Sequence, residues 1–171
     1  MTELINTPPA DATEEELDIF YMQEALRLAR MAAEADEVPV GALLVHRGRV
    51  IAAAANTRES SRCATHHAEI LAIEEACRTL HGWRLPDATL YVTLEPCPMC
   101  AGAIVNARID RVVFGAFDLR AGAFGSVVDL NALPLNHKVD IRGGVCSEDC
   151  RSVLSSYFRT KRKKQDDDCA V

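Results

Sequence analysis

Four residues in two short segments have the types and spacing for chemistry at a bound metal ion. His67 and Glu69 stand two residues apart, and Cys97 and Cys100 follow in the segment Pro96-Cys97-Pro98-Met99-Cys100. One imidazole and two thiolates can hold Zn²⁺, and a zinc site with three protein ligands leaves its fourth position to water. Zinc lowers the pKa of such a water, and a carboxylate can take the proton. The motif therefore predicts a hydrolytic zinc centre.

Both cysteines are predicted to lie at the start of a helix. Pro98 suits the first helical position, which makes Cys97 the residue that caps the helix. Cys100 is three residues further on and returns to the same helix face, so both sulfurs can meet one ion. The free N–H groups of a helix start favour negative charge and help to hold both side chains as thiolates.

The histidine is likewise predicted at a helix start, because Thr65 is a suitable N-cap for a helix over residues 65–80. Glu69 is two positions beyond His67, so its side chain points in a different direction. We therefore expect Glu69 to reach the water and not to serve as a fourth ligand.

Helical and extended patterns alternate along the rest of the chain. This alternation predicts an α/β fold with helices on both faces of a sheet, which is a three-layer α/β/α sandwich. The glycine-rich segment 117–134 fits neither pattern well. Helices are predicted over about residues 13–35, 65–80, 98–107 and 147–161, and strands over residues 40–45, 50–55, 88–94, 111–116 and 139–142.

Length and composition indicate one globular domain. With 171 residues, 49% hydrophobic and 26% charged, the chain is typical of a soluble protein that buries its own core. We predict this domain over residues 13–164, with flexible tails at 1–12 and 165–171. No signal peptide is expected at the N-terminus, and seven cysteines without one favour a reducing compartment, so a cytoplasmic location is predicted.

Charge is distributed unevenly over the chain. The formal net charge is −6, but six acids lie within residues 1–18 and three more at residues 166–168. Without these the remainder is weakly basic, and its densest basic run is Arg159-Thr160-Lys161-Arg162-Lys163-Lys164. The run is compatible with a polyanionic partner, and equally with a solvated helix end.

Two other interpretations of the cysteines stay open at this point. A Cys-x-x-Cys pair alone also occurs in structural and redox-active sites, and Cys63 could close a structural zinc site as a fourth ligand. The conjunction with His67 and Glu69 favours the catalytic interpretation. The remaining cysteines have no histidine nearby and are predicted to be packing or surface residues: Cys77, Cys146, Cys150 and Cys169.

The H-x-E and P-C-x-x-C segments match the signature of the zinc-dependent nucleobase deaminases. From about Phe20 to Lys164 the chain resembles this superfamily, and most closely the bacterial tRNA-specific adenosine deaminases. The resemblance implies a mixed five-stranded sheet and one Zn²⁺ per subunit, held by His67, Cys97 and Cys100, with Glu69 as the proton shuttle. Further matching segments are Val38-Pro39-Val40-Gly41-Ala42, Ala88 to Cys97, Cys100 to Ile104, Arg111 to Ala116 and Asn136-His137.

The resemblance also implies a set of substrate-binding residues. Asn56 would hydrogen-bond the target base, and Asp118 would contact the anticodon backbone. Asn136 would lie near the base, Phe158 would border the cleft, and Arg159 would contact RNA. Two positions depart from the family pattern. Leu119 and Arg120 follow Asp118 where Pro and Lys are common, and Cys63 stands where an acidic or polar residue is common.

The implied activity is hydrolytic deamination of adenosine to inosine at the wobble position of a tRNA anticodon, by a homodimer. One alternative is a deaminase of a free base or nucleotide, of guanine or cytidine type, with the same zinc site. Another is a non-catalytic, zinc-stabilised RNA-binding subunit. The basic run at residues 159–164 favours the tRNA substrate, and Glu69 argues against the non-catalytic subunit.

Overall fold

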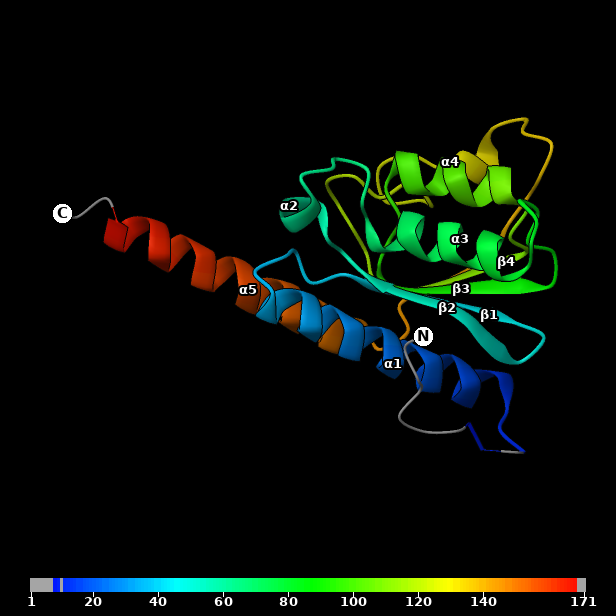
Figure 1. Cartoon of the computed structure of the whole chain (residues 1–171), viewed down its shortest axis with the longest axis horizontal. Coiled ribbons are helices and arrows are strands. Elements are labelled where there is room, and N and C mark those ends of the chain that lie inside the picture. Colours follow the sequence, from blue (N-terminus) through cyan, green and yellow to red (C-terminus); the bar gives the residue numbers. More distant parts are fainter. Residues whose placement is uncertain (1–7, 10, 169–171) are drawn as a thin grey trace.

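One mixed sheet of five strands organises the chain, with strand order β2-β1-β3-β4-β5 (Figure 1). The computed structural model describes residues 8–9 and 11–168. β1 pairs antiparallel with both β2 and β3, whereas β3, β4 and β5 run parallel to one another. The strands are β1 (Gly41–His46), β2 (Arg49–Ala55), β3 (Ala88–Leu94), β4 (Arg111–Ala116) and β5 (Asp140–Gly143).

Helices cover both faces of this sheet, so the predicted three-layer α/β/α sandwich and its mixed five-stranded sheet are confirmed (Figure 1). Because side chains alternate along a strand, neighbouring residues of β1 enter different cores. Leu43 packs with Met22 on one side, and Leu44 packs with Ile104 on the other. One face is covered by α1 (Glu14–Glu34) and α5 (Ser147–Asp168), the other by α3 (Ala68–Thr79) and α4 (Pro98–Ala107).

Local sequence signals account for several of the observed boundaries. The capping box of Thr13 and Glu16 is present at the start of α1. The predicted bounds of β3, β4 and α4 agree with the structure. The helix predicted from Thr65 instead begins at Ala68, because His67 has extended backbone angles and is the N-cap.

Two short elements were not predicted, namely α2 (Arg58–Ser61) and the 3₁₀ turn η1 (Leu130–Ala132). Three or four residues are too few to show a helical periodicity. α5 runs on beyond its predicted end near residue 161. The structure carries this helix to Asp168.

The predicted tails were 1–12 and 165–171. Residues 165–168 continue the backbone of α5, whereas residues 1–7, 10 and 169–171 lie outside the described residues. Among the residues that are described, no helix combines the length and apolar composition needed to cross a bilayer.

The topology directs several chain segments to one edge of the sheet. β3 and β4 are parallel and end there, and β1, which is antiparallel to β3, begins there. Gly41 opens β1 directly beneath α1, where a Cβ atom would overlap the Ala25 carbonyl oxygen. The glycine therefore allows α1 to pack closely on this edge. The helices α3 and α4 both begin at the same edge (Figure 1).

Candidate metal centre and active site

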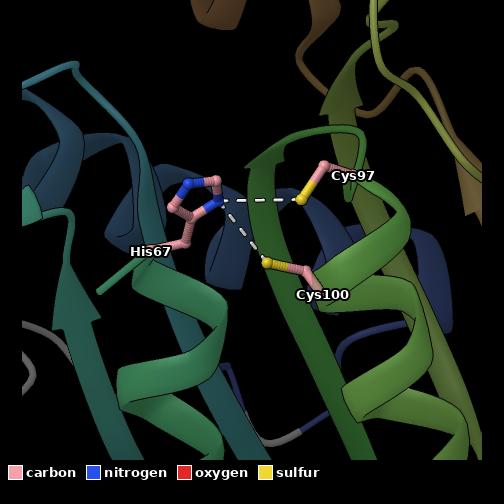
Figure 2. A group of neighbouring side chains, drawn as sticks. All are labelled: His67, Cys97 and Cys100. Atoms are coloured by element: carbon pink, nitrogen blue, oxygen red, sulfur yellow. Dashed lines mark hydrogen bonds between the residues drawn. The ribbon is translucent and has the colours of Figure 1, made fainter. Parts of the chain in front are cut away.

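The starts of α3 and α4 bring the three predicted metal ligands together (Figure 2). The Nδ1 atom of His67 lies 3.7 Å from Sγ of Cys97 and 3.6 Å from Sγ of Cys100. All three potential ligand atoms lie within 4.8 Å of one another. Cys100 is buried, and the other two side chains are half-buried, so the cluster faces a cavity on one side.

This arrangement fits a tetrahedral metal ion. Zinc binds sulfur at about 2.3 Å and nitrogen at about 2.0–2.1 Å, so two such ligands at a tetrahedral angle are separated by about 3.6 Å. The observed nitrogen–sulfur distances are close to this value. Two thiolates and one imidazole are also a donor set that borderline-soft divalent ions prefer. The cluster can therefore hold a metal without rearrangement of the chain.

The protein favours a thiolate at one position of this cluster, Cys97, whereas the hydrogen bond to Cys97 and burial raise the pKa of Cys100. The pKa of Cys97 is lowered to about 4, chiefly because its sulfur accepts a hydrogen bond from Cys100, with His67 as a second donor. Cys97 is the N-cap of α4, next to Pro98 at the helix start, where the helix dipole also stabilises a thiolate. The interaction with Cys97 raises the pKa of His67.

Glu69 lies against the cluster and is almost completely buried. Its carboxyl group is within hydrogen-bonding reach of Cys100. Burial raises the pKa of Glu69, so the side chain can hold a proton more readily than an exposed glutamate does. A carboxylate that can take and return a proton beside a metal position is suited to general acid–base chemistry.

A cavity of about 150 Å³ opens onto the cluster. It contains five of the nine residues that the sequence analysis assigned to the site. Its walls come from the segment before β1, the ends of β2 and β3, α2, the starts of α3 and α4, and the segment after β4: Val38, Val40, Asn56, Arg58, His67, Glu69, Leu94, Glu95, Cys97, Asp118 and Ala121. Cys100 belongs to the cluster but does not line the cavity.

The other three candidate residues do not line this cavity. Asn136 is exposed on the segment before β5, and Phe158 and Arg159 are exposed on α5. The ring of Phe158 packs edge-to-face on Tyr157, with 5.4 Å between the ring centroids. These three residues are available for a larger ligand that extends beyond the cavity, and their predicted roles stay predictions.

Glu95 is a residue of the cavity wall that the sequence analysis missed. It is buried directly before Pro96, and it accepts backbone hydrogen bonds from Asp118 at 3.1 Å and from Phe124 at 3.0 Å. Gly122 approaches so closely that a Cβ atom would overlap the carboxylate. Glu95 therefore fixes the glycine-rich segment after β4 beside the metal ligands.

Asp118 is oriented by its own loop. Its Oδ1 atom accepts hydrogen bonds from the backbone N–H groups of Arg120 and Ala121 at 2.9 and 3.2 Å. Cys63, the possible fourth ligand, contacts Thr65 at 3.4 Å and is not part of the metal-ligand group found among the described residues. The three-ligand arrangement therefore has an open side toward the cavity.

Comparison with known proteins agrees with this arrangement. The profile of the MafB19-like deaminase family matches residues 17–162. The tRNA-specific adenosine deaminase of Bacillus subtilis is 50% identical over 149 residues, which cover 86% of this chain and 92% of that protein. The protein of the same name from Streptococcus pyogenes serotype M1 is 40% identical, and the match covers 85% and 86% of the two chains.

Two solved structures are also similar. One comes from work on A-to-I editing by tRNA:A34 deaminases at the wobble position; it has 47% identity and a TM-score of 0.77, and covers 78% of this chain and 98% of that one. A guanine deaminase from Nitrosomonas europaea has 27% identity and a TM-score of 0.72, with 89% and 88% covered. With a family profile that matches residues 17–162 and identities of 40% and 50% over most of both chains, this protein belongs to the MafB19-like deaminase family and is a tRNA-specific adenosine deaminase.

Proposed function

We propose that this enzyme catalyses the zinc-dependent hydrolytic deamination of adenosine to inosine at the wobble position of a tRNA anticodon. The observation that supports the proposal most directly is the placement of buried Glu69 against a cluster of one histidine and two cysteines at the base of a cavity. Family membership and the wobble-position activity named for a similar structure give the same answer.

His67, Cys97 and Cys100 would hold the zinc ion. When bound, zinc supplies a Lewis acid that makes water a nucleophile at neutral pH. Glu69 would take one proton of the attacking water and give it to a ring nitrogen of the base, and would then take the proton of the new C6 hydroxyl group and give it to the departing amine. Overall, a C6–O bond forms, the C6–N bond breaks and ammonia leaves, which converts adenosine to inosine.

The size of the cavity bears on how the substrate binds. About 150 Å³ is room for a base, so the target base must leave its stack to enter. A single-stranded anticodon loop makes this extrusion easier than a duplex does. In this proposal Asn56 hydrogen-bonds the base and Asp118 contacts the backbone beside it, while Asn136, Phe158 and Arg159 contact RNA outside the cavity.

Homodimer formation is a further part of the proposal. Apolar side chains are exposed along the segment beside the cavity, with exposed fractions of 51% for Phe117, 81% for Leu119 and 56% for Val127. Exposed apolar residues gathered next to a binding site favour burial by a partner surface. We propose one deaminase domain, residues 13–164, in each subunit, and a cytoplasmic location because the proposed substrate is a tRNA.

The decisive experiment is a parallel assay with three substrates. The zinc-loaded protein is incubated with an anticodon stem-loop that carries a wobble adenosine, with guanine and with cytidine. We expect inosine from the stem-loop and no deamination of the free compounds. Turnover of guanine or cytidine without inosine formation would instead identify a free-base or nucleoside deaminase, an alternative that the likeness to the guanine deaminase keeps worth testing. Metal analysis of the same sample should give one zinc per chain.

A further inference from the structure

A second buried carboxylate, Glu37, connects several parts of the cavity wall. It lies between α1 and β1 and is 1% exposed. Its Oε2 atom accepts a hydrogen bond from Nδ2 of Asn56 at 3.2 Å and one from the backbone N–H of Glu59 at 3.0 Å. Its Oε1 atom accepts one from the backbone N–H of Ser60 at 2.6 Å. One carboxylate thus joins a cavity side chain to α2.

Glu37 replaces the usual cap of α2. In most helices the side chain of the N-cap residue accepts from the second or third helical N–H group. Thr57 is the N-cap of α2, and its side chain makes no such bond. The acceptor comes instead from Glu37, far back in the chain, at the second and third helical positions Glu59 and Ser60. The first helical residue, Arg58, lines the cavity.

The same carboxylate fixes how the Asn56 amide is turned. An ionised carboxylate only accepts hydrogen bonds, so the NH₂ group of Asn56 must face it. Within the part of the chain that the structure describes, the Asn56 side chain makes no other hydrogen bond, and no buried polar side-chain atom lacks a partner. The amide oxygen and the second amide hydrogen are therefore the groups that Asn56 offers to the cavity.

We propose that Glu37 is a positioning residue for base recognition: it locks the orientation of the Asn56 amide and couples it to the α2 turn that carries Arg58. The inference rests on the proposed function, in which Asn56 binds the target base. Without Glu37 the amide can rotate and present its donor and acceptor in either order. α2 also loses its cap, so the wall of the cavity loosens at both places together.

The test is a double-mutant cycle with Glu37→Gln and Asn56→Ala, assayed on the zinc-loaded protein with the wobble-adenosine stem-loop. Glutamine keeps the volume but turns an NH₂ group toward one of the three donors. We expect Glu37→Gln to lower kcat/KM about 10- to 100-fold. Asn56→Ala should lower kcat/KM much less in the Glu37→Gln variant than in the natural protein, because the variant has already lost the orientation of the Asn56 amide. If Asn56→Ala lowered kcat/KM by the same factor with and without Glu37→Gln, the proposal would be overturned.

The matched control is Asp18→Asn, a change at another buried carboxylate that lies at the opposite edge of the sheet. It should lower stability but leave KM and kcat per folded molecule unchanged. The loss of kcat/KM caused by Asn56→Ala should also stay the same. Glu37→Asp is the second variant, because it keeps the charge but cannot span Asn56 and α2 together. It should also weaken the coupling, whereas full coupling in Glu37→Asp would contradict the proposal.

A measurement without catalysis separates this inference from the proposed function. Solvent exchange of the Asn56 side-chain amide protons can be followed by NMR in the natural protein and in Glu37→Gln. We expect exchange to be at least about tenfold faster in the variant. If the natural protein fails to edit the stem-loop but exchange is still faster in Glu37→Gln, the proposed function is wrong, whereas the proposal that Glu37 holds the Asn56 amide is supported. Equal exchange rates in the two proteins would show that Glu37 does not hold the Asn56 amide, whatever the substrate is.

Discussion

At the scale of single residues, Glu69 is the side chain on which the proposed chemistry depends most. Its burial and its position beside Cys100 suit it to carry a proton and not to bind the metal. We expect Glu69→Ala to keep the fold and the metal but to lower kcat by about 10²- to 10⁴-fold, the usual contribution of general acid–base catalysis. Single-turnover assays with the stem-loop, together with metal analysis, measure both parts of this prediction.

Glu74 provides the matched control on the same helix. It is exposed and pairs with Arg78 at the surface, so Glu74→Ala should leave activity and metal content unchanged. If Glu69→Ala retained more than about a tenth of the natural kcat with full metal content, Glu69 would have no role in proton transfer.

Glu37 leads to a prediction about acid stability. Burial raises its pKa, but the hydrogen bonds from the backbone of Ser60 and Glu59, together with the charge of Arg58, outweigh that effect, so the pKa lies below the usual 4.5. A lowered pKa stabilises the folded state above about pH 4.5, and this stabilisation is lost as the pH falls through the folded-state value. Glu37→Gln removes this contribution.

We therefore expect Glu37→Gln to lower the free energy of unfolding by about 2 kcal/mol at pH 7. The difference between variant and natural protein should shrink as the pH falls below about 4.5. Urea unfolding at a series of pH values measures this directly. A difference that stays constant with pH would mean that Glu37 is not ionised in the folded protein.

At the scale of elements, a buried ion-pair network joins α1 to the sheet. Asp18 of α1 is completely buried and accepts hydrogen bonds from Arg111 of β4 and Arg142 of β5, each at 2.8 Å. Tyr91 of β3 donates to the same carboxylate at 2.9 Å. The network therefore anchors α1 to β3, β4 and β5.

Replacing Asp18 removes the buried acid that Arg111 and Arg142 share, and among the described residues it leaves these arginines only exposed acids as partners: Glu14, Glu15 and Asp140. We expect Asp18→Asn to lower the free energy of unfolding by about 3 kcal/mol. The exposed pair of Arg47 and Asp87 is the control, and Asp87→Asn should change stability by less than about 1 kcal/mol. Equal effects of the two substitutions in chemical denaturation would show that burial does not strengthen the Asp18 network.

At the scale of the whole molecule, α5 extends well beyond the edge of the sheet (Figure 1). Basic side chains Arg159, Arg162 and Lys163 are exposed on this part of the helix. Lys161 differs, because it pairs with Asp36 at 2.6 Å and its ammonium group lies over the ring of Tyr157. The exposed three are therefore better placed than Lys161 to meet the phosphates of a tRNA.

We expect the double change Arg162→Ala and Lys163→Ala to weaken tRNA binding. The slope of log K against log salt concentration should fall by about 0.7 for each phosphate that the variant no longer neutralises. Arg47→Ala with Arg49→Ala removes the same charge at the hairpin between β1 and β2, and is the control. If both double variants bound tRNA with equally reduced affinity, the effect would come from overall charge and not from a binding surface on α5.

The sequence was most informative where the required contacts are local. His67 and Glu69 stand at one helix start and Cys97 and Cys100 at another, so short-range rules of capping and spacing were sufficient to predict a metal cluster. The apolar runs of β3 and β4 likewise identified these strands with their observed bounds. Proline at the start of α4 marked that helix for the same local reason.

The tertiary structure alone decided which other residues complete the site. Glu37 and Glu95 are isolated acids in the sequence. In the fold, each carboxylate accepts hydrogen bonds from backbone N–H groups that lie more than 20 residues away in the chain. No local pattern encodes such a partner, since the hydrogen bonds exist only after α1, β3 and their loops have packed. The sequence by itself determined the ligand set of the candidate metal centre, and the packing of distant segments determined the shape of the cavity around it.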